Sequence, residues 1–244
     1  MRLTKRMQAV ANLVEPTRTA ADIGCDHAYI SIWLCDNEIA LKVIATDINE
    51  GPLAIARQNI KEAGFSDRIS TRLSDGASAI RPGEADCLIL AGMGGELIIK
   101  ILTDSLPVVA QAHQLVLSPQ SDVEKTRHAV EEMGFYLNHE EMVEEDGKFY
   151  VCMDARRIGH TFWEEKDGSF YEKPVFYRYG RNLLTSRNPV LYRYLCRRKE
   201  QLSAILEHLP EGSETEGPRR ELEAKLSLTY EALSYFDPKY RVGI

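Results

Sequence analysis

The fold of this chain is decided by Thr19-Ala20-Ala21-Asp22-Ile23-Gly24-Cys25-Asp26-His27-Ala28-Tyr29, an apolar run that ends in a glycine turn before a helical pattern. Nucleotide-binding α/β domains hold their cofactor at such a strand-to-helix turn. A dinucleotide fold would have G-x-G-x-x-G here, with the helix N-terminus open to a pyrophosphate. Asp26 puts a negative charge at the second glycine position, which disfavours NAD and FAD. S-adenosylmethionine carries a sulfonium cation and no phosphate, so it tolerates this carboxylate; the alternative is that Asp26 caps the helix.

Apolar runs and helical patterns alternate around this stretch, up to about residue 157. The expected strands are 19–23, 43–47, 69–73, 87–90 and 115–117, and the expected helices include 3–14, 52–63, 96–102 and 123–133. Strands that alternate with helices predict a doubly wound, Rossmann-like parallel sheet in an α/β domain. Residues 136–143 and 149–155 flank Glu145-Asp146-Gly147, which predicts an antiparallel hairpin that closes the sheet.

Acidic residues follow the next two expected strands. Asp47 lies about 20 residues beyond Gly24, where a carboxylate can accept hydrogen bonds from both hydroxyls of a ribose. Asp75 could accept from an adenine amino group, while Gly76 lets the backbone approach the ligand closely. We therefore expect these residues to form one cofactor site with Asp26. The alternatives are a solvated aspartate at a strand end and an ordinary Asp-Gly turn.

The expected fourth strand is followed by Ala91-Gly92-Met93-Gly94-Gly95-Glu96. Its glycines leave room for a flat substrate ring. The Asn-Pro-Pro-Tyr-type tetrapeptide of enzymes that methylate exocyclic amines is absent, which argues against that chemistry. Gln120, after the fifth strand, could face the same site. The alternative for the glycine run is a mobile loop before a helix.

Taken together, these motifs resemble one family. The stretches 22–29, 45–49, 92–95 and 118–120 are similar to the signature of the bacterial tRNA adenine-22 N1-methyltransferases, and the similarity covers nearly the whole chain. The resemblance implies S-adenosylmethionine as the cofactor and N1 of an adenine in tRNA as the target. The residues implied to contact the methyl donor are Gly24, Asp26, Asp47, Asn49, Asp75, Gly76, Gly92 and Met93. Those implied to surround the reacting base are Asp26, His27, Tyr29, Met93 and Gly94.

Methylation at adenine N1 needs no general base, because the ring nitrogen already has an in-plane lone pair. The protein must extrude the base, align N1 with the methyl group and shield the site. Since the product ring is cationic, Asp26 is expected to stabilise the developing charge. Tyr29 could stack on or orient the base. His27 is equally well explained as a packing residue at the start of the helix.

The C-terminal part has a different periodicity. Beyond an expected linker at 159–174, two series of apolar residues fit heptad positions on either side of a turn at 210–218: Leu191, Leu195, Leu202, Ile205 and Leu209, then Leu222, Leu226, Leu233 and Phe236. They predict an antiparallel coiled-coil hairpin, in which the leucines serve packing. The expected domains are therefore 1–158, which binds S-adenosylmethionine, and 159–244, which binds tRNA.

The net charge of −7 argues against a nucleic-acid partner, but the charge is unevenly placed. Residues 173–199 contain eight basic residues and no acidic one. Arginines bind phosphates as bidentate donors, and interleaved aromatic rings stack on bases. The alternative is a helix surface whose tyrosines pack on the hairpin. The residues expected to bind RNA are Arg178, Arg181, Arg187, Arg193, Arg197 and Arg198.

Composition disfavours other classes. No apolar run is long enough for a membrane span, and no apolar segment follows the basic N-terminus, so we expect a cytoplasmic protein. Five scattered cysteines without a C-x-x-C pair predict neither disulfides nor a metal site. Two alternatives remain: a methyltransferase for a small molecule or protein that forms a homodimer, and a non-catalytic RNA-binding protein with a degenerate Rossmann domain. The acid-free basic run speaks against the first, and the intact Gly24, Asp47 and Asp75 against the second.

Overall fold

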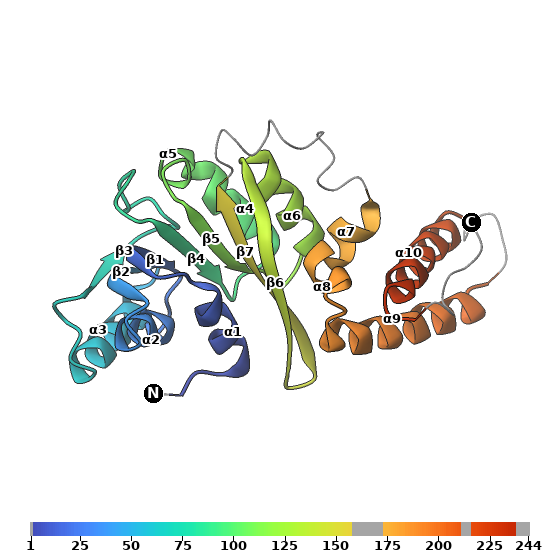
Figure 1. Ribbon diagram of the computed structural model, residues 1–244, viewed down its shortest axis with the longest axis horizontal. Helices are drawn as coiled ribbons and strands as arrows, with labels where there is room; N and C mark the ends of the chain where they lie inside the picture. Colours follow the sequence, from blue (N-terminus) through green and yellow to red (C-terminus); the bar gives the residue numbers. More distant parts are fainter. Residues whose placement is uncertain (1, 158–172, 211–215, 238–244) are drawn as a thin grey trace. The chain divides into compact units, whose positions relative to one another are not determined.

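The computed structural model describes residues 2–157, 173–210 and 216–237. The chain divides into two compact units, Met1–Asp167 and Gly168–Ile244. The first unit contains a seven-stranded sheet in the order β3-β2-β1-β4-β5-β7-β6 (Figure 1). Its strands are β1 (Thr17–Ile23), β2 (Ala40–Asp47), β3 (Ile69–Leu73), β4 (Cys87–Ala91), β5 (Gln114–Ser118), β6 (Phe135–Glu145) and β7 (Lys148–Arg157). The strands β1 to β5 pair in parallel, and β7 pairs antiparallel with both β5 and β6. The predicted doubly wound sheet with a closing hairpin is confirmed.

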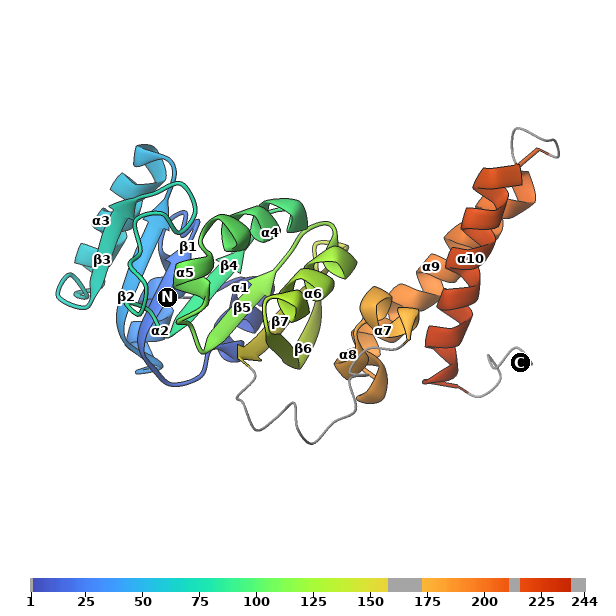
Figure 2. The same ribbon diagram turned by 90° about the horizontal axis from the view of Figure 1, so that it is seen from above.

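Helices cover both faces of this sheet. They are α1 (Lys5–Leu13), α2 (Tyr29–Asp36), α3 (Glu50–Glu62), α4 (Gly95–Asp104), α5 (Leu106–Val109) and α6 (Val123–Glu132). Helices α1 to α3 lie on one face and α4 to α6 on the other (Figures 1 and 2). Nearly every residue of β4 and β5 is buried, which explains why these strands are continuous apolar runs. The chain runs outward from β1 to β3 and then crosses back to β4, so the switch point lies between β1 and β4.

The closing hairpin turns at Asp146 and Gly147. Both have positive φ, 50° and 73°, as a two-residue type I′ turn requires. Asp and Gly tolerate this left-handed conformation better than other residues. The sequence Glu145-Asp146-Gly147 therefore predicted the hairpin turn correctly.

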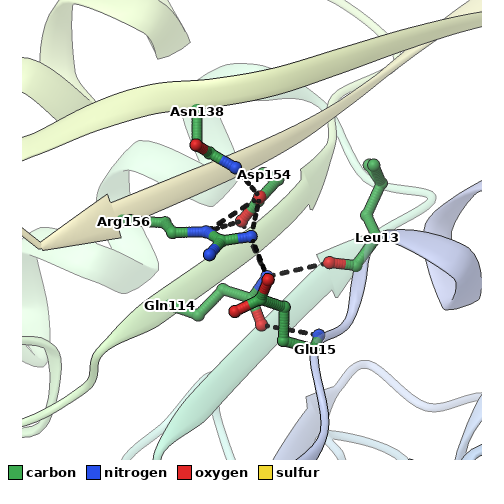
Figure 3. A network of polar contacts seen from close by, with 6 residues as sticks. All are labelled: Leu13, Glu15, Gln114, Asn138, Asp154 and Arg156. Atoms are coloured by element: carbon green, nitrogen blue, oxygen red, sulfur yellow. Dashed lines mark hydrogen bonds and ion pairs between the residues drawn. The ribbon is translucent and has the colours of Figure 1, made fainter.

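At the amino edge of the sheet, a polar network ties α1 to β5 and β7 (Figure 3). The buried Asp154 carboxylate accepts hydrogen bonds from Gln114 at 2.7 Å, from Asn138 at 2.8 Å and from Arg156 at 2.8 Å. Gln114 also donates to the last carbonyl of α1 at 2.8 Å. Arg156 forms an ion pair of 2.7 Å with Glu15, just beyond that helix. The C-terminal end of α1 is thus fixed to the sheet.

The second unit is helical, with α7 (Pro174–Tyr179), α8 (Arg181–Thr185), α9 (Pro189–His208) and α10 (Glu216–Ser234). Tyr192 near the start of α9 contacts Phe236 just beyond α10, with ring centroids 5.3 Å apart. At the other end, Arg219 donates to the Leu209 carbonyl at 3.0 Å. The two long helices are therefore antiparallel, as predicted. The expected linker falls mostly on 158–172, outside the described residues, and Pro174 already belongs to α7.

The predicted heptad seam is wrong at one position. Leu191, Leu195 and Leu202 are buried, but the Ile205 side chain is 49% exposed, and the neighbouring Leu206 is half-buried instead. A straight helix drifts by about 20° per heptad relative to a strict 3.5-residue repeat. The apolar stripe consequently moves from Ile205 to Leu206.

Candidate functional site

The carboxyl ends of β1 and β2 are joined by hydrogen bonds. The Gly24 and Cys25 amides donate to the Thr46 carbonyl at 2.9 and 2.8 Å, so the loop after β1 is hydrogen-bonded to the end of β2. At the end of β2, the Asp47 carboxylate accepts from the Asp26 amide at 3.3 Å and from the Asn49 amide at 2.9 Å. Asp47 therefore shapes both loops. Each of its oxygens keeps a second lone pair, with which it can accept from a ligand.

The loop after β1 has an unusual backbone. Gly24, Asp26 and Ala28 all have positive φ, at 74°, 51° and 60°. Non-glycine residues rarely adopt this conformation, and such strain concentrates at functional sites. The N-cap of α2 is Ala28, with no side-chain capping bond, so the alternative in which Asp26 caps the helix is wrong. The Asp26 carboxylate is instead 59% exposed.

His27 and Tyr29 lie beside this carboxylate. His27 Nε2 is 3.5 Å from Asp26 Oδ1, while its Nδ1 is buried without a hydrogen-bond partner among the described residues. The Asn59 side chain of α3 donates to the His27 carbonyl at 3.0 Å and so ties the loop to α3. The Tyr29 ring is half-buried, 5.8 Å from the His27 ring in an edge-on arrangement.

The segment after β3 joins the same edge. The Ser74 amide donates to the Asp47 carbonyl at 2.9 Å, and the Ser74 hydroxyl donates to the Gly76 carbonyl at 2.9 Å. Asp75 is exposed between them. Gly76 has φ 57°, and a Cβ on it would lie 2.9 Å from the Ile101 side chain, so glycine is also required here for packing against α4.

The glycine loop after β4 contacts the loop after β1. A Cβ on Gly24 would lie 2.9 Å from the Met93 methyl carbon, so these two positions are in direct contact. The Gln120 amide donates to the Met93 carbonyl at 3.0 Å, which confirms that the segment after β5 reaches the same edge. A Cβ on Gly94 would lie 3.1 Å from the Ser121 hydroxyl. The predicted strand-end residues therefore gather along one edge.

These loops and this strand order are those of a known family. The sequence profile of the family described as methyltransferase domain matches residues 3–153. The chain belongs to this methyltransferase-domain family. A Bacillus subtilis (strain 168) protein named tRNA (adenine(22)-N(1))-methyltransferase is 29% identical over an alignment of 234 residues that covers 85% of this chain and 98% of that protein.

Solved structures agree with this assignment. The crystal structure of the B. subtilis tRNA methyltransferase TrmK matches with a TM-score of 0.81 and 28% identity, over 95% of this chain and 99% of that one. A Streptococcus pneumoniae protein in complex with S-adenosyl-L-methionine matches with a TM-score of 0.81 and 27% identity, over 95% of this chain and 100% of that one. The resemblance to tRNA adenine-22 N1-methyltransferases that the motifs predicted is confirmed.

Two residues of the first motif, Asp22 and Cys25, were given no chemical role in the sequence analysis. Asp22 is buried at the end of β1, where the Ser31 hydroxyl donates to it at 2.6 Å. Burial raises the pKa of this carboxyl to about 6. Cys25 is also buried, and burial raises the pKa of its thiol, so it stays protonated and unreactive.

The raised pKa of Asp22 predicts how stability depends on pH. Between its ordinary value of 3.8 and about 6, the folded chain holds a proton that the unfolded chain has lost. The free energy of unfolding therefore falls as pH rises through this window, by about 3 kcal/mol for this group. Asp22→Asn cannot ionise, so its stability relative to wild type should improve by about 2–3 kcal/mol between pH 4 and pH 8. Urea unfolding at both pH values measures this, and a constant difference would contradict it.

The expected RNA-binding arginines all lie in the second unit. Arg187, Arg193 and Arg197 are exposed, and the other three are half-buried. Some interleaved rings pack within the unit. The Tyr179 hydroxyl is buried, 2.8 Å from the Thr229 hydroxyl, and Tyr192 packs against Phe236. For these two rings the alternative of packing on the hairpin is confirmed, which leaves the arginines as the candidates for phosphate contacts.

None of the described helices has the length and apolar composition that a membrane crossing requires. Within the described ranges, no three His, Cys, Asp or Glu side chains are grouped as metal ligands would be.

Proposed function

We propose that this chain transfers the methyl group of S-adenosylmethionine to N1 of an adenine in tRNA, at position 22 as in the relatives. The observation that carries the proposal is the junction of the loops at the switch point of the sheet, where the Asp47 carboxylate accepts from the Asp26 amide and Gly24 contacts Met93. Two negative charges at this place suit a sulfonium donor and repel a pyrophosphate. The relatives, which carry the names of tRNA methyltransferases, support the substrate class.

The proposed roles follow the strand order. In our proposal Asp47 accepts from the ribose hydroxyls, and the exposed Asp75 accepts from the adenine of the donor. Their neighbours in the donor site would be Gly24, Asn49, Gly76, Gly92 and Met93.

The target adenine would lie at the other end of this site. Its N1 lone pair forms the new bond to the methyl carbon as the carbon–sulfur bond breaks, and the ring gains the positive charge. Asp26 then lies where a carboxylate can stabilise that charge. His27 would orient Asp26, and Tyr29, Met93 and Gly94 would complete the walls around the base.

Mass-spectrometric mapping of nucleosides tests this function. Unmodified tRNA is incubated with the chain and S-adenosylmethionine, then digested. The expected product is 1-methyladenosine, one per molecule, at position 22, and a transcript with guanine there should stay unmethylated. A different methylated nucleoside would contradict the proposed target. If the donor binds in calorimetry but no tRNA is methylated, the alternative of a small-molecule or protein substrate is favoured; if no donor binds, the non-catalytic alternative is.

For the second unit we propose a role in binding tRNA through its arginines. Affinity should fall steeply with salt, since each neutralised phosphate releases counterions. Replacing Arg193, Arg197 and Arg198 together with Gln should flatten the slope of log affinity against log salt by up to about one for each lost contact. Filter binding across a salt series measures this.

The matched control removes three exposed cations from the first unit, Lys42, Lys61 and Arg81, and should leave the slope almost unchanged. Equal slopes for wild type and the arginine variant would instead assign the helical pair to packing or to a homodimer. Sedimentation of the chain would then decide between those two roles.

A further inference from the structure

Arg6 reaches the site from α1, a helix to which the motifs assigned no part in catalysis. Its guanidinium lies against Gly92 of the glycine loop: a Cβ on Gly92 would be 3.3 Å from one terminal nitrogen and 3.8 Å from the other. Gly92 has φ 85°, so glycine serves both the backbone and this approach. Arg6 is half-buried, whereas its basic neighbours Arg2 and Lys5 are exposed.

The guanidinium has no anionic partner in the part of the chain that the structure describes. Among the described residues, no carboxylate lies within the 4.0 Å of an ion pair, and no acceptor is hydrogen-bonded to its five N–H groups. Besides Gly92, it contacts the Tyr150 ring, whose centroid is 5.5 Å away. The ring face attracts the cation, but it gives the N–H groups of the guanidinium no conventional hydrogen-bond acceptor. Partial burial without an acceptor is unfavourable, and an oxyanion would relieve it.

Helix α1 holds Arg6 in this position. The Thr4 hydroxyl accepts from the Met7 amide at 3.3 Å, and the Lys5 amide donates to Glu145 of β6 at 2.6 Å. Val10 and Ala11 are fully buried, and the network of Figure 3 fixes the other end of the helix. The Arg6 side chain therefore starts from a rigid base, as a preorganised binding group should.

We propose that Arg6 binds an oxyanion at the Gly92 side of the methyl-transfer site. This rests on the proposed function, which offers two sources: the α-carboxylate of the donor and a phosphate of the tRNA. Both present paired oxygens to the guanidinium fork. The strand order favours the carboxylate. The proposed donor has its adenine at Asp75 beyond β3 and its ribose at Asp47 beyond β2. Its amino-acid end would then extend past β1 toward β4, where Arg6 lies beside Gly92.

The test compares Arg6→Gln with Lys5→Gln, which removes the same charge one residue away from an exposed side chain. Calorimetry is done with S-adenosylmethionine and with its decarboxylated analogue. If the carboxylate is the ligand, Arg6→Gln should weaken binding of S-adenosylmethionine on the order of 10- to 100-fold and leave binding of the analogue unchanged. Lys5→Gln should change neither. The melting temperature checks the fold, and Arg6→Lys, which keeps the charge, should lose part of the affinity without unfolding.

The second arm measures tRNA. Unchanged donor affinity with a higher KM for tRNA, and a salt slope reduced by about one relative to Lys5→Gln, would identify a phosphate as the ligand. If neither donor nor tRNA binding differs between Arg6→Gln and Lys5→Gln, the proposal is overturned. If wild-type chain methylates no tRNA, the proposed function fails, and the donor arm still decides whether Arg6 binds an oxyanion.

Discussion

Glu140→Ala is expected to lower the free energy of unfolding of the first unit by about 3–5 kcal/mol. The Glu140 side chain in β6 is fully buried, and Arg127 in α6 is 1% exposed. One carboxylate oxygen accepts from Arg127 Nε at 2.9 Å and from its terminal nitrogen at 2.8 Å. Removing the carboxylate takes from a buried guanidinium the charged acceptor of these two contacts. Urea unfolding followed by circular dichroism measures the loss.

The neighbouring strand residue supplies the control. Glu141 has a side chain that is 42% exposed, so Glu141→Ala should change stability by less than about 0.5 kcal/mol. Replacing both members of the buried pair, as Arg127→Met with Glu140→Leu, should restore most of the stability, because both buried charges of the pair are removed together. Equal effects of Glu140→Ala and Glu141→Ala would mean that the buried pair does not hold α6 on the sheet.

The buried pair of Arg127 and Glu140 could not be predicted from the sequence. Charged residues within amphipathic patterns are usually solvated, so the patterns around Arg127 and Glu140 do not indicate a buried pair. The strands were predictable for the opposite reason: β4 and β5 are buried on both faces, which requires continuous apolar runs. The short helices α5, α7 and α8 were not predicted, since segments of 4 to 6 residues carry too little periodicity.

The candidate site, like the fold, has parts that the sequence predicted and parts that it did not. Asp47, Asp75 and the Gly92–Gly95 run were predicted to share a site, and they do lie where the parallel strands end: the Ser74 amide donates to the Asp47 carbonyl, and the Gly92 amide donates to the Ser118 carbonyl. Neither Arg6 nor Asn59 was predicted to lie at these loops, because each approaches from a helix. Which loop a helical side chain reaches depends on how the helix packs, and local sequence does not encode that.

Asp26→Asn should slow methyl transfer about 10- to 100-fold, a larger loss than that of donor or tRNA affinity. The variant keeps the size of the side chain and the backbone bond to Asp47, since Asp26 uses its amide there. It removes the charge opposite a ring that becomes cationic only as the bond forms. Although the free carboxylate is 59% exposed, a bound base would displace water and strengthen the interaction. Single-turnover rates at saturating tRNA isolate this step.

Asp47→Asn provides the contrast. Asp47 is proposed to bind the ribose, and its carboxylate also accepts the Asp26 and Asn49 amides. The change should therefore weaken donor binding in calorimetry by about 10-fold or more, as expected for hydrogen bonds to a charged group. Opposite signatures would separate a group that binds from one that acts in the transition state: lost rate for Asp26→Asn, and lost affinity for Asp47→Asn. If Asp26→Asn instead loses donor affinity in proportion to rate, Asp26 is a cofactor ligand, and the cationic adenine must be stabilised by another group or by the exclusion of water alone.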